Sequence, residues 1–356
     1  LQTFFNPTNT LNKTLNTKSL TSKKYPNIFY IVPDSLSSPK ILKNYADISF
    51  EDSIKNFEEK GFTVPKHGYS SYNMTYLSLA ALFKMDYPVT EKSLIYKDTY
   101  DFYPIIRERK PELLQYLTKN NYKFLIVPSV WGGCPSSKEY RCVKPKGSSY
   151  LKNFFQDYAI LTFMQSSFFY KVFNEYKSFR YEDVDDAIKI ALNEMKKNPK
   201  TWSEGGVFTM IHAMMPHEPY REENCSITDS YTSPSKKGYR SSVYCSFNRI
   251  HELSDFIIKN YPNATIVVQA DHGLFTEKEP MKFAEFSNSL IDSRLGIFTA
   301  VRGCNSNQAA KLNQANIVKY IVECIANGTQ TKQLENKSFF GFYENSPEYG
   351  KVFRVR

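Results

Sequence analysis

Long apolar runs and clusters of basic residues are both missing from this sequence. No apolar run is long enough to cross a membrane: residues 158–173 come nearest, but Gln165, Ser166 and Ser167 interrupt them. Lys and Arg number 46 against 36 Asp and Glu, a formal net charge of +10, yet no five basic residues are consecutive. This scattered excess is typical of solvated surface, and no nucleic-acid-binding motif is present. An anionic membrane surface or an acidic substrate suits the charge better.

CxxC motifs are also absent, and no cysteine lies beside a histidine at zinc-finger spacing. An even number of cysteines in sequence-local pairs instead predicts disulfides formed in an oxidising compartment. Six reduced, partly buried thiols in a cytosolic enzyme are the alternative. The three pairs are Cys134 with Cys142, Cys225 with Cys245, and Cys304 with Cys324.

The printed sequence shows no signal-peptide pattern, although its cysteine pairs suit an extracytoplasmic protein. We therefore expect a membrane anchor that precedes the first residue in the full-length protein. Residues 1–24 are rich in Asn, Thr and Lys without a sustained period, which predicts a linker or stalk. Residues 25–356 would then form the folded domain. The chain is 41% hydrophobic and 15% aromatic, which is enough for a sizeable core.

Strand and helix signals alternate along this domain, which predicts an α/β fold. The expected architecture is a mostly parallel central sheet with helices on both faces. Short apolar runs predict strands at residues 27–32, 123–127, 206–211, 266–268 and 295–301. Helical spacing predicts helices at residues 49–60, 75–85, 110–120, 151–176, 183–196, 238–261 and 312–325. In the first of these helices, Ser49 is the expected cap and Gly61 the stop.

Residues able to bind a metal or a substrate follow several predicted strands. Asp34 follows the first strand, and Asp271 and His272 follow the β-branched run in TIVVQADHGLF. His212 and His217 lie after another strand, in a segment whose prolines exclude a shared helix face and so predict a loop. In an open parallel sheet the carboxyl ends of the strands face the ligand crevice. We therefore expect these residues to lie together.

Each of these residues also has a simpler interpretation. Asp34 and Asp271 can cap the segments that follow them, and His217 and His272 can be ordinary exposed histidines. Thr75, at the start of a predicted helix, can be its N-cap. A hydroxyl at a helix start also faces the positive end of the macrodipole, where a phosphate or sulfate ester would be drawn, so Thr75 is alternatively a nucleophile.

Two carboxylates, an imidazole and a hydroxyl make a mixed oxygen and nitrogen donor set that suits Zn²⁺ or Mn²⁺. Such an ion would lower the pKa of the Thr75 hydroxyl and neutralise an ester oxyanion. The Thr75 hydroxyl, a weak nucleophile by itself, could then attack the ester.

The order and wording of four segments resemble the alkaline phosphatase and sulfatase superfamily. The segments are NIFYIVPDSLSS, SSYNMTYLSLAALFKMDYP, HAMMPHEPY and VVQADHG. The second is similar to bacterial membrane-anchored sulfatase-like proteins, in which a threonine occupies the nucleophile position. In the third, the spacing from His212 to His217, followed by Pro219, is similar to that in phosphoethanolamine transferases. Its HEPY end resembles lipoteichoic acid synthases.

The resemblance implies a sulfatase-like catalytic domain and a role for each residue of the set. Asp34, Thr75, Asp271 and His272 would ligate the first metal, and Thr75 would become covalently phosphorylated. His212 and His217 would bind substrate, with His217 in contact with the transferred phosphate.

Two departures from the family narrow the predicted nucleophile and the expected number of metal ions. No CxPxR stretch exists, so the formylglycine nucleophile of ordinary sulfatases is excluded. No histidine follows His272, so the additional downstream histidine of phosphoethanolamine transferases and alkaline phosphatases is missing. We expect one divalent transition metal.

The main hypothesis is an enzyme on the periplasmic or extracellular face of a bacterial membrane. It would transfer or hydrolyse a phosphate-linked head group of an envelope lipid or glycan through a phosphothreonine intermediate. One alternative is a domain of this fold that binds an anionic glycan or lipid without turnover, and a second is a sulfate or phosphate ester hydrolase. A cytosolic phosphomutase or phosphodiesterase of the same fold would instead have six free thiols.

Overall fold

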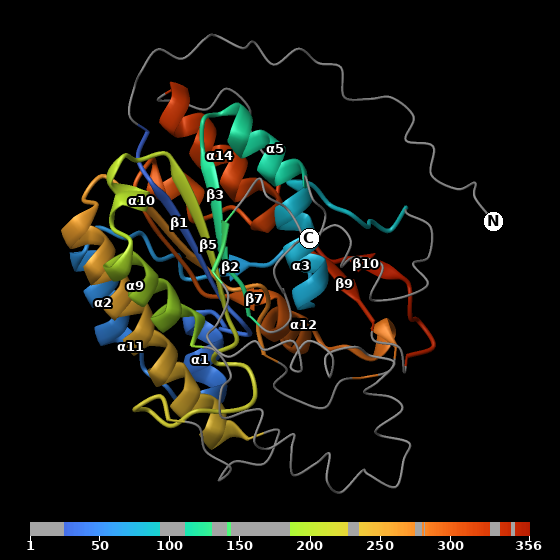
Figure 1. Cartoon of the computed structure of the whole chain (residues 1–356). Coiled ribbons are helices and arrows are strands. Elements are labelled where there is room, and N and C mark those ends of the chain that lie inside the picture. The colour runs from blue at the N-terminus through green and yellow to red at the C-terminus, as the bar shows by residue number, and fades with distance from the viewer. Residues whose placement is uncertain are drawn as a thin grey trace, which may run out of the picture.

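The central sheet is built from the apolar runs of the sequence. The computed structural model describes residues 25–92, 111–129, 141–143, 186–226, 235–274, 280, 282–327, 335–342 and 346–356 (Figure 1). The sheet has six strands in the order β4-β3-β5-β1-β6-β8. Neighbouring strands are parallel except for β6 and β8, which are antiparallel. The strands are β1 (Ile28–Pro33), β3 (Lys123–Val127), β4 (Arg141–Cys142), β5 (Val207–Ala213), β6 (Thr265–Gln269) and β8 (Thr299–Arg302).

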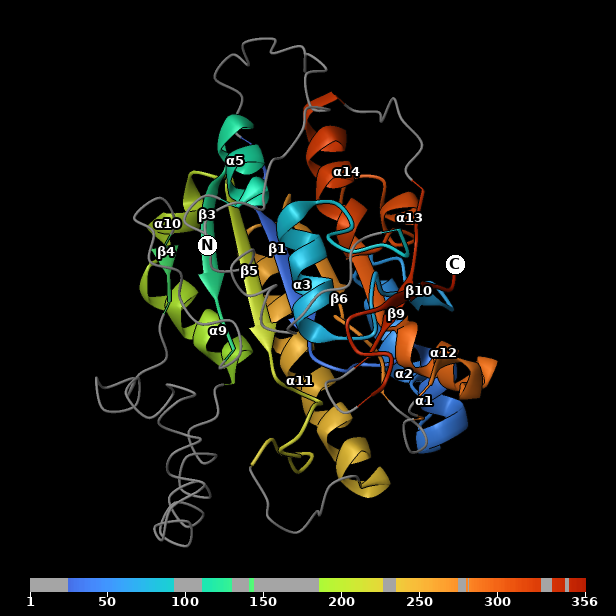
Figure 2. The same ribbon diagram turned by 90° about the vertical axis from the view of Figure 1, so that its right-hand side faces the viewer.

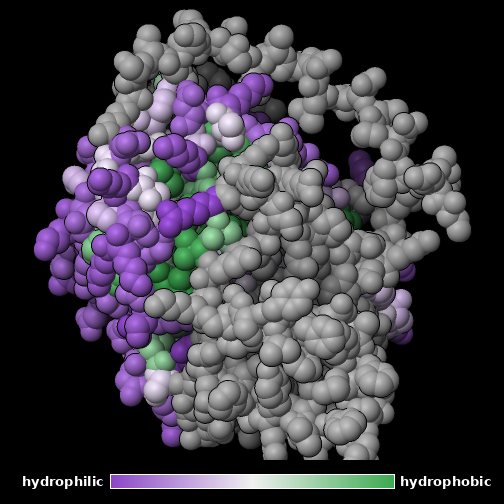
Figure 3. Space-filling view, in the orientation of Figure 1, coloured by the Kyte–Doolittle hydropathy of each residue, from purple (hydrophilic) through white to green (hydrophobic). Residues whose placement is uncertain are grey.

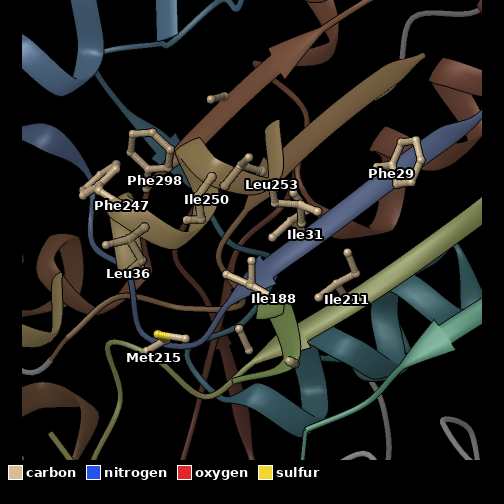
Figure 4. Packing of buried hydrophobic residues seen from close by; sticks show 14 of the residues in the cluster. Phe29, Ile31, Leu36, Ile188, Ile211, Met215, Phe247, Ile250, Leu253 and Phe298 are labelled. Atoms are coloured by element: carbon tan, nitrogen blue, oxygen red, sulfur yellow. The ribbon is translucent and has the colours of Figure 1, made fainter. Parts of the chain in front are cut away.

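The strands are buried on both faces because alternate side chains enter two different cores. In β1, Tyr30 and Val32 belong to one apolar cluster, whereas Phe29 and Ile31 belong to the other. Figure 4 shows the second cluster, in which Ile31 packs near Ile250 and Leu253 from a covering helix. The predicted fold class, a mostly parallel sheet with helices on both faces, is therefore confirmed.

Helices cover the two faces in separate groups, which lie on opposite sides of the sheet in Figure 1. Figure 2 shows the sheet from the side of α3 and α14. One group is α3 (Thr75–Lys84), α5 (Glu112–Lys119) and α14 (Gln314–Asn327). The other is α1 (Pro39–Ala46), α2 (Glu51–Glu59), α9 (Ala187–Lys197) and α11 (Lys236–Asn260).

Short elements complete the fold. Two small antiparallel sheets pair β2 (Gly68–Tyr69) with β7 (Gly296–Ile297), and β9 (Phe339–Gly341) with β10 (Val352–Arg354). The remaining elements are α10 (Lys200–Ser203), η2 (Phe283–Glu285), α12 (Asn288–Leu295) and α13 (Ser306–Ala309).

The structure departs from the sequence expectations at two elements. Helix α2 forms as predicted, but its N-cap is Phe50 and Ser49 does not cap it. The single strand expected at residues 295–301 is instead the end of α12 followed by β7 and β8. The linker expected at residues 1–24 and the helix expected at residues 151–176 lie outside the described residues.

Two of the three expected disulfides are present. Cys225 is bonded to Cys245 and Cys304 to Cys324. Cys134 lies outside the described residues, so its pairing with Cys142 stays a prediction.

The described surface visible in Figure 3 is largely hydrophilic. Among the described helices, none is both long and apolar enough to span a bilayer.

Candidate metal centre

Three adjacent strands at the middle of the sheet bring the predicted residues together. Strand β1 lies between β5 and β6 and runs parallel to both, so all three end at the same edge. His212 lies on β5 opposite Val32, while Asp34 directly follows β1 and donates its N–H to the Ala213 carbonyl at 2.8 Å. Asp271 follows β6 by two residues. This register places side chains from three distant segments at one point.

Asp34, His212 and Asp271 are fully buried, and one ligand atom from each lies within 4.8 Å of the others. Asp271 Oδ2 and His212 Nε2 are buried without a hydrogen-bond partner among the described residues. A buried polar atom without a partner is costly, and a cation in this cluster would satisfy both. The donor set therefore fits a metal ion.

His272 adds a fourth donor with suitable spacing. The four ligand atoms of a tetrahedral Zn²⁺ site lie about 3.3–3.6 Å apart, because each is about 2.0–2.2 Å from the ion. His272 Nε2 is 3.6 Å from Asp271 Oδ2 and 3.7 Å from Asp34 Oδ1. It is also 3.0 Å from Thr75 Oγ1. These separations bracket the range that one ion requires.

Thr75 is the first residue of α3 and is half-buried. The N-cap of this helix is Met74, so the Thr75 hydroxyl is not used as a cap. It points to His272 instead. The first N–H groups of α3 have no acceptor within the helix, so its positive end lies beside the hydroxyl.

Hydrogen bonds define the tautomer of His272. Its Nδ1 lies 2.9 Å from the Gly273 carbonyl, which can only accept, so Nδ1 carries the hydrogen. The lone pair is then on Nε2, the nitrogen that faces Thr75 and the two carboxylates. Burial and the nearby Arg294 charge lower the pKa of His272 to about 3, so the ring is neutral at pH 7. A neutral imidazole in this tautomer is suited to metal binding.

The two carboxylates titrate differently although both are buried. Burial and the Asp271 charge raise the pKa of Asp34 to about 7. Burial also acts to raise the pKa of Asp271, but the attraction of His272 and His212 outweighs it and lowers that pKa. Burial lowers the pKa of His212. Close carboxylates at different protonation states are typical of sites that bind a cation or move a proton.

His217 lies in the loop that follows β5, as predicted. Its N–H donates to the Asp34 carbonyl at 3.2 Å, and its Nδ1 lies 2.8 Å from the Glu218 carbonyl. Nδ1 therefore carries the hydrogen and Nε2 the lone pair. The half-buried ring acts electrostatically on Asp34, His212 and His272, so it borders the centre.

The structure places His212 beside the two carboxylates, and its predicted role in substrate binding stays a prediction. Its Nε2 is 3.8 Å from Asp34 Oδ2, and its Nδ1 contacts Ser129 Oγ at 2.8 Å. A contact of this kind to the second ring nitrogen orients a ligating imidazole. The sequence carried a signal for this, since His212 lies at a strand end.

Three residues at the centre were missed by the sequence reasoning. Ser35 donates its N–H to Asp271 Oδ1 at 3.1 Å and its hydroxyl to Asp34 Oδ1 at 3.2 Å. Gln314 bridges the Ser71 N–H and the Ala270 carbonyl, both at 2.7 Å, and so ties the segment before α3 to the end of β6. Arg294 lies against His272 and Gly273. Side-chain type at a strand end does not reveal such contacts.

Solved structures of low sequence identity share this fold. One is the C-terminal periplasmic domain of the phosphoethanolamine transferase EptC from Campylobacter jejuni, with 11% identity, coverage of 85% of this chain and 90% of that chain, and a TM-score of 0.50. The C-terminal periplasmic domain of EptC from Escherichia coli, in complex with zinc, has 10% identity, coverage of 93% and 97%, and a TM-score of 0.51.

Two further structures extend the comparison. The lipoteichoic acid synthase LtaP from Listeria monocytogenes has 10% identity, coverage of 92% of this chain and 80% of that chain, and a TM-score of 0.53. A protein in the alkaline phosphatase superfamily from Vibrio parahaemolyticus has 10% identity, coverage of 90% and 74%, and a TM-score of 0.50. No protein-family model and no curated protein matches the sequence. At these identities the likeness is one of fold.

Proposed function

Because the chain has the fold of the alkaline phosphatase superfamily, we propose that it is a metal-dependent enzyme acting on a phosphate-linked head group of an envelope lipid or glycan. One observation carries the proposal: Thr75 Oγ1 lies 3.0 Å from the unprotonated Nε2 of His272, beside two buried carboxylates. A hydroxyl in contact with a neutral imidazole and cation-binding groups has the arrangement of an activated nucleophile.

We assign one divalent cation to Asp34, Thr75, Asp271 and His272, with His212 as a further donor. The unpartnered Asp271 Oδ2 and His212 Nε2 support this assignment. Carboxylates and imidazoles suit Zn²⁺ or Mn²⁺, and the zinc complex of the Escherichia coli EptC domain favours zinc. When bound, such a cation lowers the pKa of an adjacent hydroxyl and neutralises charge on a phosphoryl oxygen.

Thr75 acts as the nucleophile in the first step. A bond forms between its Oγ1 and phosphorus while the bond from phosphorus to the leaving alcohol oxygen breaks. The lone pair of His217 Nε2 is assigned to accept the proton that Thr75 loses and to pass it to the leaving oxygen, because Nδ1 is held by the Glu218 carbonyl. Water or an acceptor alcohol then takes the phosphoryl group from phosphothreonine. Water would make the enzyme a hydrolase, and an alcohol would make it a transferase.

The substrate class and location rest on the same fold. EptC is a phosphoethanolamine transferase with a periplasmic domain, and LtaP is a lipoteichoic acid synthase. We assign this chain to the periplasmic or extracellular face of a bacterial membrane, with residues 25–356 as the catalytic domain and residues 1–24 as a linker. The two disulfides support an oxidising compartment, and the net charge of +10 suits an anionic membrane surface.

The nucleophile is tested by comparing Thr75→Ala and Thr75→Ser with the parent chain. Each protein is incubated with Zn²⁺ or Mn²⁺ and a phosphodiester model substrate, and both turnover and intact protein mass are measured. The parent chain should turn over the substrate and gain the mass of the transferred phosphoryl group. Thr75→Ala should lose both, and Thr75→Ser should retain part of the turnover because it keeps the hydroxyl.

Thr63→Ala is the matched control. Thr63 is also half-buried, and its hydroxyl contacts Ser306 and Asn307 outside the centre. This variant should behave like the parent. Equal turnover by Thr75→Ala and the parent would remove the nucleophile assignment. A parent chain that binds an anionic glycan or lipid but shows neither turnover nor a mass adduct would favour a binding function.

A further inference from the structure

Arg294 is a buried arginine at the candidate metal centre. It lies near the end of α12, in a segment without a sequence-level functional signal, and is 6% exposed. Its Nη1 donates to the Gly273 carbonyl at 2.7 Å, and its own carbonyl accepts the Gly273 N–H at 2.7 Å. Main chain and side chain therefore hold Arg294 against the DHG segment.

The guanidinium lies close to the proposed nucleophile. Arg294 Nη2 is 3.5 Å from His272 Nε2, and this His272 nitrogen is 3.0 Å from Thr75 Oγ1. Nη2 and Oγ1 are thus at most 6.5 Å apart. That value is an upper limit, and a phosphoryl group bonded to Oγ1 extends its oxygens beyond Oγ1, where a guanidinium can donate a charge-assisted hydrogen bond of about 2.8 Å.

Electrostatics place the same positive charge inside the centre. Arg294 Nη2 lies 3.5 Å from His272 Nε2, the nitrogen that is itself 3.6 Å from Asp271 Oδ2 and 3.7 Å from Asp34 Oδ1. A guanidinium beside a bound metal ion would add a second positive charge, which attracts an anionic ligand to the centre. A transferring phosphoryl group is such an anion, and a guanidinium fork matches its oxygens.

We propose that Arg294 binds the phosphoryl group carried by Thr75 and so supplies a second positive charge at this centre. The inference rests on the proposed function, since it needs phosphorus chemistry at Thr75. It also gives a physical reason why no histidine is needed after His272: a guanidinium fixed by α12 neutralises the phosphoryl oxygens.

Arg294→Gln separates this role from a structural one, because the two predict different changes in binding. Removing a positive charge beside the donors should leave Zn²⁺ affinity unchanged or tighter, whereas inorganic phosphate should bind the metal-loaded protein about 10- to 100-fold more weakly. Both affinities are measured by calorimetric titration, and turnover should fall with phosphate affinity. A structural role would weaken metal and phosphate binding together.

Arg302→Gln is the matched control. Arg302 is a partly buried arginine, and it donates to the carbonyls of Lys60, Pro262 and Ala264 away from the centre. This variant should alter neither affinity. Arg294→Lys keeps the positive charge but loses the planar, bidentate donors of the guanidinium. It should therefore give a phosphate affinity between those of the parent and Arg294→Gln. It also provides the comparison if Arg294→Gln does not fold.

Three outcomes would overturn the inference. They are an Arg294→Gln variant with parental phosphate affinity, an equal loss of metal and phosphate affinity, and an Arg294→Lys variant that binds no phosphate while remaining folded and metal-bound. A parent chain that binds neither Zn²⁺ nor phosphate would instead overturn the proposed function itself. The two failures are therefore distinguishable.

Discussion

Ser35 shows how one residue arranges several groups of the candidate site. It contacts both carboxylates, its Oγ lies 3.1 Å from His272 Nδ1, and its carbonyl accepts from Tyr239 Oη at 2.8 Å. To do this it adopts φ +63°, a left-handed conformation that is costly for a residue with a Cβ. Strain of this kind is retained where the surrounding contacts fix the conformation.

Comparing Ser35→Ala with Ser35→Gly separates strain from hydroxyl contacts. Both variants lose the hydroxyl, so both should bind Zn²⁺ about 10- to 100-fold more weakly than the parent. Only glycine relieves the left-handed strain, so Ser35→Gly should be more stable than Ser35→Ala by about 1 kcal/mol. Urea denaturation and metal titration measure the two effects. Parental Zn²⁺ affinity in both variants would contradict the orienting role of Ser35.

His251 makes a different contribution, to the pH dependence of stability. Its ring packs on Phe57 with centroids 4.3 Å apart, and neither ring nitrogen has a hydrogen-bond partner among the described residues. Burial and the Lys60 charge lower its pKa to about 4, against about 6.5 in an unfolded chain. Between these values the unfolded chain binds more protons, so this contribution is complete above pH 6.5 and is lost as the pH falls toward 4.

Replacing His251 with phenylalanine should flatten that part of the pH profile. Phenylalanine keeps an aromatic ring beside Phe57 and does not titrate. The free energy of unfolding, measured between pH 4 and pH 7, should therefore fall less steeply with acid in His251→Phe than in the parent. Because His212 and His272 remain in both proteins, the difference isolates His251. Identical slopes would mean that His251 is charged in the folded protein.

At the scale of elements, the sequence predicted the central strands and most covering helices. The apolar run at residues 123–127 predicts a strand from local sequence alone, and the helical spacing of apolar residues at 312–325 predicts a helix in the same way. Strand ends also predicted that Asp34, Asp271 and His272 would meet, because a parallel sheet aligns those ends. Helix α12 was missed because residues 288–294 are mostly polar, and the apolar run at residues 295–301, which suggested a strand, overlaps the helix only at Leu295. Its position depends on contacts with the DHG segment, which are distant in sequence.

Gly273 permits that close approach of α12. A Cβ at this position would lie 2.1 Å from the Ser293 carbonyl oxygen and 2.6 Å from that of Gly296. Gly273→Ala should therefore displace the end of α12 together with Arg294 and His272. We expect a loss of about 2 kcal/mol or more in the free energy of unfolding and weaker Zn²⁺ binding.

Gly61→Ala provides the comparison for Gly273→Ala. Gly61 has φ +82°, and a Cβ added there would have Arg302 Nε as its nearest neighbour, at 3.9 Å. The Gly61→Ala variant is therefore strained in its backbone but has no steric clash. It should lose about 1 kcal/mol and retain its Zn²⁺ affinity, as denaturation and metal titration would show. A Gly273→Ala variant that matches Gly61→Ala in both measurements would contradict the packing argument.

At the scale of the whole molecule, each disulfide attaches a surface segment to a helix that covers one face of the sheet. Cys245 lies in α11 within the second core cluster, and Cys324 lies in α14 within the first. Their partners, Cys225 and Cys304, follow the His217 loop and β8 respectively. The two bonds thus stabilise both layers around the sheet.

The disulfides should contribute equally to stability but unequally to activity. Both have a sequence separation of 20, so replacing either pair with serine should lower the free energy of unfolding by about 3 kcal/mol. Loss of Cys225–Cys245 should also reduce turnover, because it releases the segment after His217. Urea denaturation with and without reductant, together with turnover, measures both effects. A parent chain whose denaturation midpoint is unchanged by reductant, and whose thiols all react under denaturing conditions, would place it in a reducing compartment and remove the envelope assignment.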